Sequence, residues 1–278
     1  MIEFFSYAFI QRAFVVGILV SLCSSLLGVS LVLRRYSMIG DGLSHVGFGA
    51  LALASVLSLP PMAVTIPVVV VAAILLLRLD GHGRMGGEGA VALLAASSLA
   101  IGVVLISYVK GTNTDINNFL FGSLLAVGRL DMVLSIVVSL FVLASYICLY
   151  PRLYALTFDS TFAQASGLKV ERYTMLLSIL SAVTIVLGMR MLGSLLVSAL
   201  VIFPCLTAMR IARSYKAVTL VSAVQSVVCF VLGFTMSCLA GTPVGASIVV
   251  VNLLAFLVFW LLGAMRDRGL FVRKGPSL

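Results

Sequence analysis

Asp41 and His45 are the acid and the histidine of this sequence that lie well inside a long apolar segment, residues 36–59. They are four positions apart, so on a helix both side chains lie on one face. Ionisable groups at the centre of a bilayer cost at least ~2.5 kcal/mol and usually serve a function. Counted from Arg35 at ~1.5 Å per residue, Asp41 lies about 9 Å and His45 about 15 Å into the segment. His45 is therefore expected near the middle of a hydrocarbon core of about 30 Å, where transport sites commonly lie.

The chemistry of this pair favours a transition metal. A carboxylate with an imidazole suits zinc, manganese or iron(II) better than sodium or calcium. Two ligands are too few for a closed site, but two copies of the chain meeting at these helices would supply four, the usual number for zinc. From spacing alone, a proton relay and an intrahelical hydrogen bond that only fixes packing stay open. The small residues around the pair allow close helix approach and do not discriminate; they are Gly40, Gly42, Ser44, Gly47, Gly49 and Ala50.

The composition requires lipid as the solvent for the elements that carry this pair. The 278 residues are 62% hydrophobic and only 10% charged, whereas a soluble domain is about half apolar and a quarter charged. A membrane-spanning helix needs about 20 apolar residues. Segments of this kind lie at about 13–33, 36–59, 62–79, 90–109, 132–150, 173–188, 191–211, 217–239 and 245–264. The sequence predicts an all-α polytopic protein with eight to nine transmembrane helices, forming one transmembrane domain over residues 1–278.

Other segments limit the function classes. Residues 116–128 are apolar but too short to span, which predicts a re-entrant or interfacial helix. The glycine-rich segment 81–89 lacks the G-x-x-x-x-G-K-[ST] pattern of a phosphate-binding loop, as does the rest of the chain, so ATP hydrolysis would belong to another protein. The five cysteines lie in apolar segments without a C-x-x-C pair and are expected to be inert.

Basic residues set the expected orientation. The net charge is +9, but the cations sit between apolar segments, where they determine topology. This distribution argues against nucleic-acid binding. With the N-terminus outside and nine crossings, 14 of the 18 Lys and Arg residues lie on the inner side. The C-terminus is therefore expected in the cytoplasm.

Two further segments have functional potential. Residues 158–168, between the fifth and sixth apolar segments, predict a short amphipathic helix on the inner face, capped by Asp159 and ended by Gly167. An ordinary capped loop helix is the simpler alternative. Pro204 lies inside the segment 191–211 and frees a backbone carbonyl, which either lines a pathway or only kinks the helix.

Taken together, these stretches resemble the permease family of ABC importers for zinc, manganese and iron, over nearly the whole chain. The stretch 35–45, RYSMIGDGLSH, is similar to the family pattern R-x-x-S-x-x-G-D-x-x-S/A-H. The other carriers of the resemblance are 119–127, the Asp159–Ala163–Gly167 segment, 193–208 and Thr242–Pro243–Val244–Gly245.

The resemblance implies roles for individual residues. Asp41 and His45 match positions that bind the metal in transit. The coupling helix that docks on the ATPase matches Phe158, Asp159, Ala163, Gly167 and Leu168. Ser123, Pro204 and Pro243 are candidate pathway or gating positions.

The resemblance also implies an assembly. Two permease copies and two cytoplasmic ABC ATPase subunits would form a complex in a bacterial plasma membrane. An extracytoplasmic metal-binding protein would deliver Zn or Mn, with no permanently bound cofactor. Transport would proceed by alternating access, and the chain itself would not be an enzyme. Many relatives carry an acid at the position of Ser123, and some zinc-type relatives a histidine near Ala96, so the metal stays open.

Three rival functions fit less well. A permease for siderophores or cobalamin needs a wide cavity and no metal ligands, which conflicts with the Asp41 and His45 pair. A proton-coupled carrier would not need a docking helix on its inner face. An intramembrane enzyme would need a fuller set of catalytic groups, and neither G-x-S-x-G nor H-E-x-x-H occurs.

The basic-residue distribution yields a testable topology. Cysteine labelling in intact cells should place residues 151–172 and 265–278 on the cytoplasmic side and Gly241–Gly245 outside, because inner loops retain Lys and Arg. Labelling of the Arg213 loop from outside would contradict the orientation of the second half.

Overall fold

The structure, a computed structural model, describes residues 8–82, 87–108, 122 and 128–267, and this part of the chain holds ten helices and no strand. In order they are α1 (Ala8–Leu33), α2 (Ser37–Val56), α3 (Pro61–His82), α4 (Gly87–Tyr108), α6 (Arg129–Phe158), α7 (Ser160–Ala165), α8 (Val170–Leu192), α9 (Ser194–Ile211), α10 (Tyr215–Ala240) and α11 (Val244–Asp267). Each of the nine apolar segments corresponds to one helix, and α7 is the predicted short helix. The all-α prediction is confirmed.

The outer surface of the bundle is apolar. Eight helices are long and apolar enough to cross a membrane, and the apolar part of α9, Leu196–Ile211, is shorter. Large side chains face outward along the periphery, among them Phe141, Ile147 and Leu220, each about two-thirds exposed. Such a surface suits lipid, since water would not solvate it.

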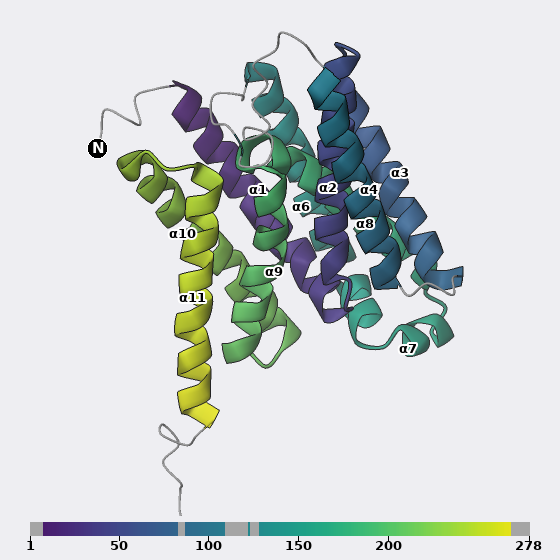
Figure 1. The fold of residues 1–278 in the computed structure, drawn as a ribbon. Helices are drawn as coiled ribbons and strands as arrows, with labels where there is room; N and C mark the ends of the chain where they lie inside the picture. The colour runs from purple at the N-terminus through teal and green to yellow at the C-terminus, as the bar shows by residue number, and fades with distance from the viewer. Residues whose placement is uncertain (1–7, 83–86, 109–121, 123–127, 268–278) are drawn as a thin grey trace, which may run out of the picture.

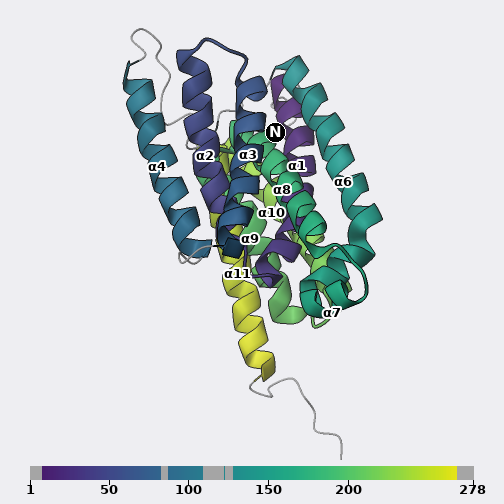
Figure 2. The ribbon, with the colours of Figure 1, turned by 90° about the vertical axis from the view of Figure 1, so that its right-hand side faces the viewer.

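The helices form a central group and an outer group (Figures 1 and 2). Helix α9 lies in the interior and contacts α1, α2, α8, α10 and α11. More than half of the apolar stretch of α1, α2 and α8 is buried, but only about a fifth of that of α4 and α6. The central group therefore positions any site inside the bundle.

Charge is concentrated at one end of the bundle, which we call the basic end. Arg34, Arg78 and Arg172 line one cavity there, and Arg210 and Arg213 line a second. Helix α7 lies at this end, and the first turn of α6 lies at the opposite end (Figure 1). This separation matches the distribution on which the expected topology rests.

Two sequence expectations need comment. The predicted range of the fifth span, 132–150, is too short, because α6 continues through Pro151 to Phe158. Pro151 does not end the helix, since rings on one side of α6 pack against Tyr215 before and after it. The predicted re-entrant helix at 116–128 lies almost wholly outside the described residues.

Glycines allow central helices to approach at backbone distance. A side chain at Gly28 of α1 would collide with the carbonyl oxygen of Val201 in α9. A side chain at Gly233 of α10 would come 2.6 Å from the Cα of Ile248 in α11. Close approach of this kind is a main source of helix association in lipid, where apolar burial alone gives little preference for protein over lipid contact.

Gly28→Ala should destabilise the protein by about 1–3 kcal/mol, because the added methyl group forces α1 and α9 apart. Gly40→Ala is the matched control, since its new atom would also face Val201 but at 3.8 Å, an ordinary contact distance. Thermal unfolding of the detergent-solubilised protein should show a lower midpoint for Gly28→Ala alone. Equal midpoints would contradict the packing argument.

Candidate metal site and docking helix

Asp41 and His45 lie on the open stripe of α2, which we define as Met38, Asp41, His45, Gly49 and Leu53. Between residues 38 and 53 these are the α2 positions that are not buried, and they recur every three or four residues on one helix face. The side chain of Asp41 is 45% exposed and that of His45 is 14% exposed. The pair thus faces away from the chain's own core, toward space that this copy of the chain leaves uncovered.

The two side chains are close but not hydrogen-bonded. Nε2 of His45 lies 3.7 Å from Oδ2 of Asp41, beyond hydrogen-bond distance. Two ligands on one tetrahedral ion, each at 2.0–2.1 Å, are about 3.3 Å apart, so a small rotation would let both bind one cation. Nδ1 of His45 is buried and has no hydrogen-bond partner among the described residues. A purely structural hydrogen bond between the two side chains is therefore poorly supported by the geometry.

The rest of α2 is enclosed through its glycines. A side chain at Gly42 would meet Val91 of α4 at 2.7 Å, and one at Gly47 would meet Met189 of α8 at 2.7 Å. Gly49 belongs to the open stripe but is partly covered, since a side chain there would meet the carbonyl oxygen of Ser98 in α4 at 2.8 Å. These contacts fix the rotation of α2 about its axis. The open stripe is the face that remains.

One chain supplies only part of a metal coordination shell. Among the described residues, no group of three or more His, Cys, Asp or Glu side chains could hold a metal ion. Asp41 and His45 are brought together as their spacing predicts, and they form a pair of potential ligands. Ser123, a candidate pathway position, lies outside the described residues.

Helix α7 is defined by caps at both ends. Oδ1 of Asp159 accepts a hydrogen bond from the Phe162 amide at 2.8 Å, and Gly167 adopts φ +85° after the last turn. The amides of Gly167 and Leu168 donate to the carbonyls of Gln164 and Ala163, both at 3.0 Å, which is the Schellman arrangement. The predicted capping roles of Asp159 and Gly167 are confirmed.

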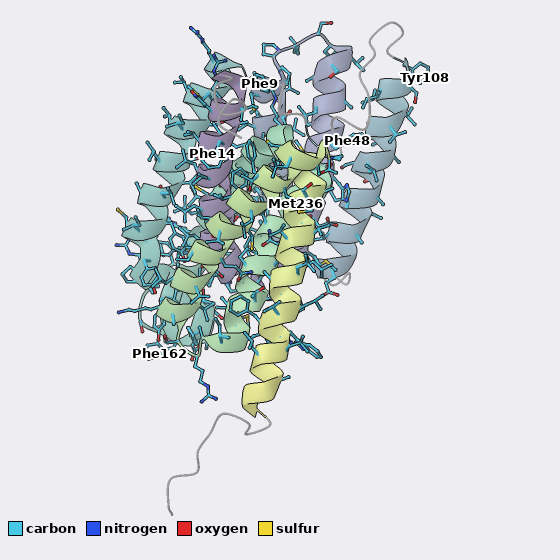
Figure 3. The ribbon with its side chains drawn as sticks, turned by 90° about the vertical axis from the view of Figure 1, so that its left-hand side faces the viewer. Phe9, Phe14, Phe48, Tyr108, Phe162 and Met236 are labelled. Atoms are coloured by element: carbon cyan, nitrogen blue, oxygen red, sulfur yellow. The ribbon has the colours of Figure 1, made fainter. Side chains whose placement is uncertain are left out.

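The two faces of α7 differ. Ala163 is buried against the bundle, whereas Phe158 and Phe162 are 63% and 68% exposed. Phe162 protrudes at the end of the molecule opposite Tyr108 (Figure 3). An exposed phenylalanine on a short capped helix at the basic end offers an apolar contact to a partner in water.

The two prolines occupy different settings. Pro204 is buried inside α9, which remains helical around it. Pro243 precedes α11, and its carbonyl accepts a hydrogen bond from the Ser247 amide at 3.1 Å. A side chain at Gly245 would collide with the carbonyl oxygen of Leu192 at the end of α8. Pro243 therefore lies in the turn that joins α10 and α11 beside α8.

Two clusters were not anticipated from the sequence. At the opposite end from α7, Nη1 of Arg190 lies 2.7 Å from Oδ1 of Asp131. At the basic end, the hydroxyl of Tyr215 lies 2.9 Å from Oγ of Ser30, and its ring packs near Tyr150 and Tyr154. The spacing of Tyr146, Tyr150 and Tyr154 marks one face of α6, but only the fold shows what that face contacts.

Comparison with known proteins decides the family. A model of the ABC 3 transport family matches residues 6–263. The chain belongs to the ABC 3 transport family. The resemblance in motifs is thereby confirmed, and so is the class: a membrane-spanning transport subunit.

Family relatives cover the chain almost end to end. The chain is 33% identical to the manganese import system permease protein ScaB of Streptococcus gordonii, over 91% of this chain and 90% of that protein. It is 29% identical to the high-affinity zinc uptake system membrane protein ZnuB of Haemophilus influenzae, over 88% and 94%. The solved structure of PsaBC from Streptococcus pneumoniae in complex with Fab is 29% identical, with a TM-score of 0.83 over 94% of this chain and 95% of that chain.

Proposed function

We propose that this chain is the permease subunit of an ABC importer that carries Mn²⁺ or Zn²⁺ into the cytoplasm, energised by separate ATPase subunits. The observation that carries the metal assignment is the Asp41 and His45 pair on the open stripe of α2. Relatives named for manganese and for zinc support the same two ions. Carboxylate and imidazole ligands suit both.

The metal site is completed by a second copy of the chain. Each copy offers one carboxylate and one imidazole, with Nε2 and Oδ2 3.7 Å apart. When two open stripes face each other, two Asp41 and two His45 side chains surround one ion. The uncovered face of α2 supports this arrangement, because these two ionisable side chains would otherwise face lipid.

A short structural route joins the docking helix to the metal. Helix α8 contacts both α7 and α2, and Met189 of α8 packs where Gly47 of α2 leaves room. Helix α6 runs directly into α7 through Asp159. ATP-driven closure of the ATPase subunits would displace α7, and α8 would pass this movement to the metal-binding stripe.

The basic end faces the cytoplasm in this proposal. Positively charged loops are retained on that side, and α7 lies there, within reach of an ATPase. The end of α11, at Asp267, lies on the same side. The opposite end, with the Asp131 and Arg190 ion pair, would receive metal from an extracytoplasmic binding protein.

Asp41→Asn and His45→Gln should each abolish metal uptake, a loss of at least about 100-fold, because each removes a metal ligand. Both variants keep side-chain volume, and the wild-type pair shares no hydrogen bond, so thermal stability should change by less than about 0.5 kcal/mol. The measurement is radiometal uptake into vesicles that contain the whole complex, with ATP on the side of the ATPase subunits.

Asp131→Asn serves as the comparison for that experiment. It weakens an ion pair at the far end of the bundle. It should therefore lower thermal stability while leaving most of the metal uptake intact. Near-normal uptake by both Asp41→Asn and His45→Gln would disprove the metal site and leave the pair as part of the packing.

Phe162→Ala should weaken co-purification of the ATPase subunit about ten-fold or more, since it removes an exposed apolar contact from α7 without disturbing the caps. Phe141→Ala is the matched control, because Phe141 is equally exposed at 65% but lies within the span of α6. Pull-down of the tagged permease with quantification of bound ATPase measures the effect. Equal losses in the two variants would argue against α7 as the docking helix.

A further inference from the structure

A cavity of about 710 Å³ opens at the basic end between α3, α7 and α8. Its charged lining comes from four separate places: Arg34 after α1, Arg78 on α3, Lys169 before α8, and Glu171 and Arg172 in the first turn of α8. Four cations thus face one acid. We call this cavity the basic pocket.

Three of the four cations of the basic pocket form no salt bridge with an acidic side chain of the described residues. Within the described parts of the chain, no carboxylate lies at salt-bridge distance from Arg78, Lys169 or Arg172. Arg34 is held in place, with Nη1 donating to Oγ1 of Thr174 at 2.9 Å and its guanidinium 5.1 Å from the centre of the Tyr36 ring. A pocket with this charge balance attracts an anion.

The start of α8 adds to this attraction. Its capping position is Lys169, whose side chain makes no capping hydrogen bond. The amides of Val170 and Arg172 donate to the carbonyls of Leu168 and Lys169, so the contribution of α8 to the pocket is the positive end of its helix dipole, which favours an anion. The volume exceeds that of a simple ion and fits a small organic headgroup.

Apolar surface continues from the pocket toward the membrane. On α3, Leu75 and Val71 lie one and two turns from Arg78 and are 45% and 64% exposed. On α8, Leu176 lies one turn from Arg172 and is 36% exposed. Helices α3 and α8 contact each other, and Figure 2 views the molecule from the side where α3 stands in front of α8. The surface thus changes from cationic to apolar over about 6 Å along each helix.

We propose that the basic pocket binds the phosphate headgroup of an anionic phospholipid from the adjacent leaflet, with its acyl chains along Val71, Leu75 and Leu176. Basic pockets between membrane helices bind such headgroups. An ATPase surface would match the charges but not the apolar strip, which lies within the membrane. The lipid would hold the end of α3 against the segment that joins α7 to α8.

The test compares wild-type protein with the double variant Arg78→Gln/Arg172→Gln in nanodiscs of phosphatidylcholine with increasing phosphatidylglycerol. Native mass spectrometry counts bound phosphatidylglycerol, and the thermal midpoint reports stabilisation. Each basic residue near a membrane surface contributes a factor of about five, so the double variant should bind about 25-fold more weakly. Arg210→Gln/Arg213→Gln removes the same charge from the other cavity of the basic end and should bind as wild type.

Glu171→Gln keeps the experiment decisive if the double variant folds poorly. Removing Glu171, the one acid among the described residues that line the pocket, should raise phosphatidylglycerol affinity about five-fold, a gain that misfolding cannot produce. Equal loss in both double variants would overturn the proposal, as would an unchanged affinity in Glu171→Gln.

Two further measurements distinguish a lipid headgroup in the basic pocket from a soluble anion and from the ATPase. Inorganic phosphate in phosphatidylcholine nanodiscs should not reproduce the stabilisation, and an equal effect would overturn the lipid assignment in favour of a soluble anion. ATPase co-purification should be unaffected by Arg78→Gln/Arg172→Gln. Loss of the ATPase with normal lipid binding would assign the pocket to the protein partner instead.

Discussion

The close approach of helix backbones at glycine positions is the constraint on which the rest of this structure depends. Lipid tails are as apolar as leucine side chains, so apolar burial alone does not hold membrane helices together. Gly28 lets α1 meet α9, and Gly42 and Gly47 let α2 pack against α4 and α8. Once these faces are used, one stripe of α2 remains open. The placement of Asp41 and His45 follows from the face of α2 that these close contacts leave uncovered.

Local features of this chain could be predicted from the sequence because they depend on neighbours in the chain. The length of the apolar segments predicted the long helices, and the four-residue spacing placed Asp41 and His45 on one helix face. Helix α7 is specified by Asp159 at its start and Gly167 at its end, both acting within a few residues. Pro151 lies inside α6 without ending it, and only the fold shows the packing against Tyr215 before and after it.

Features that bring distant segments of the chain together could not be predicted from the sequence. Asp131 and Arg190 are 59 positions apart and meet only because α6 and α8 pack side by side. The basic pocket gathers residues from the ends of α1, α3 and α8. Exposure of the α2 stripe is also a property of packing, since the sequence shows which residues share a face but not whether a neighbour covers it. Family membership agrees with the motifs that the sequence shows.

Helix α6 has a mechanical consequence. Its 30 residues make a rod about 45 Å long, half again as long as the hydrocarbon core. Its first turn holds the ion pair with Arg190, and its last residue, Phe158, adjoins α7. Tyr150 and Tyr154 pack it against Tyr215 near the α7 end, and it also contacts α1 and α8. A tilt of about 5° about these contacts would move the first turn of α6, about 33 Å away, by about 3 Å, so a displacement at α7 would also be felt on the other side of the membrane.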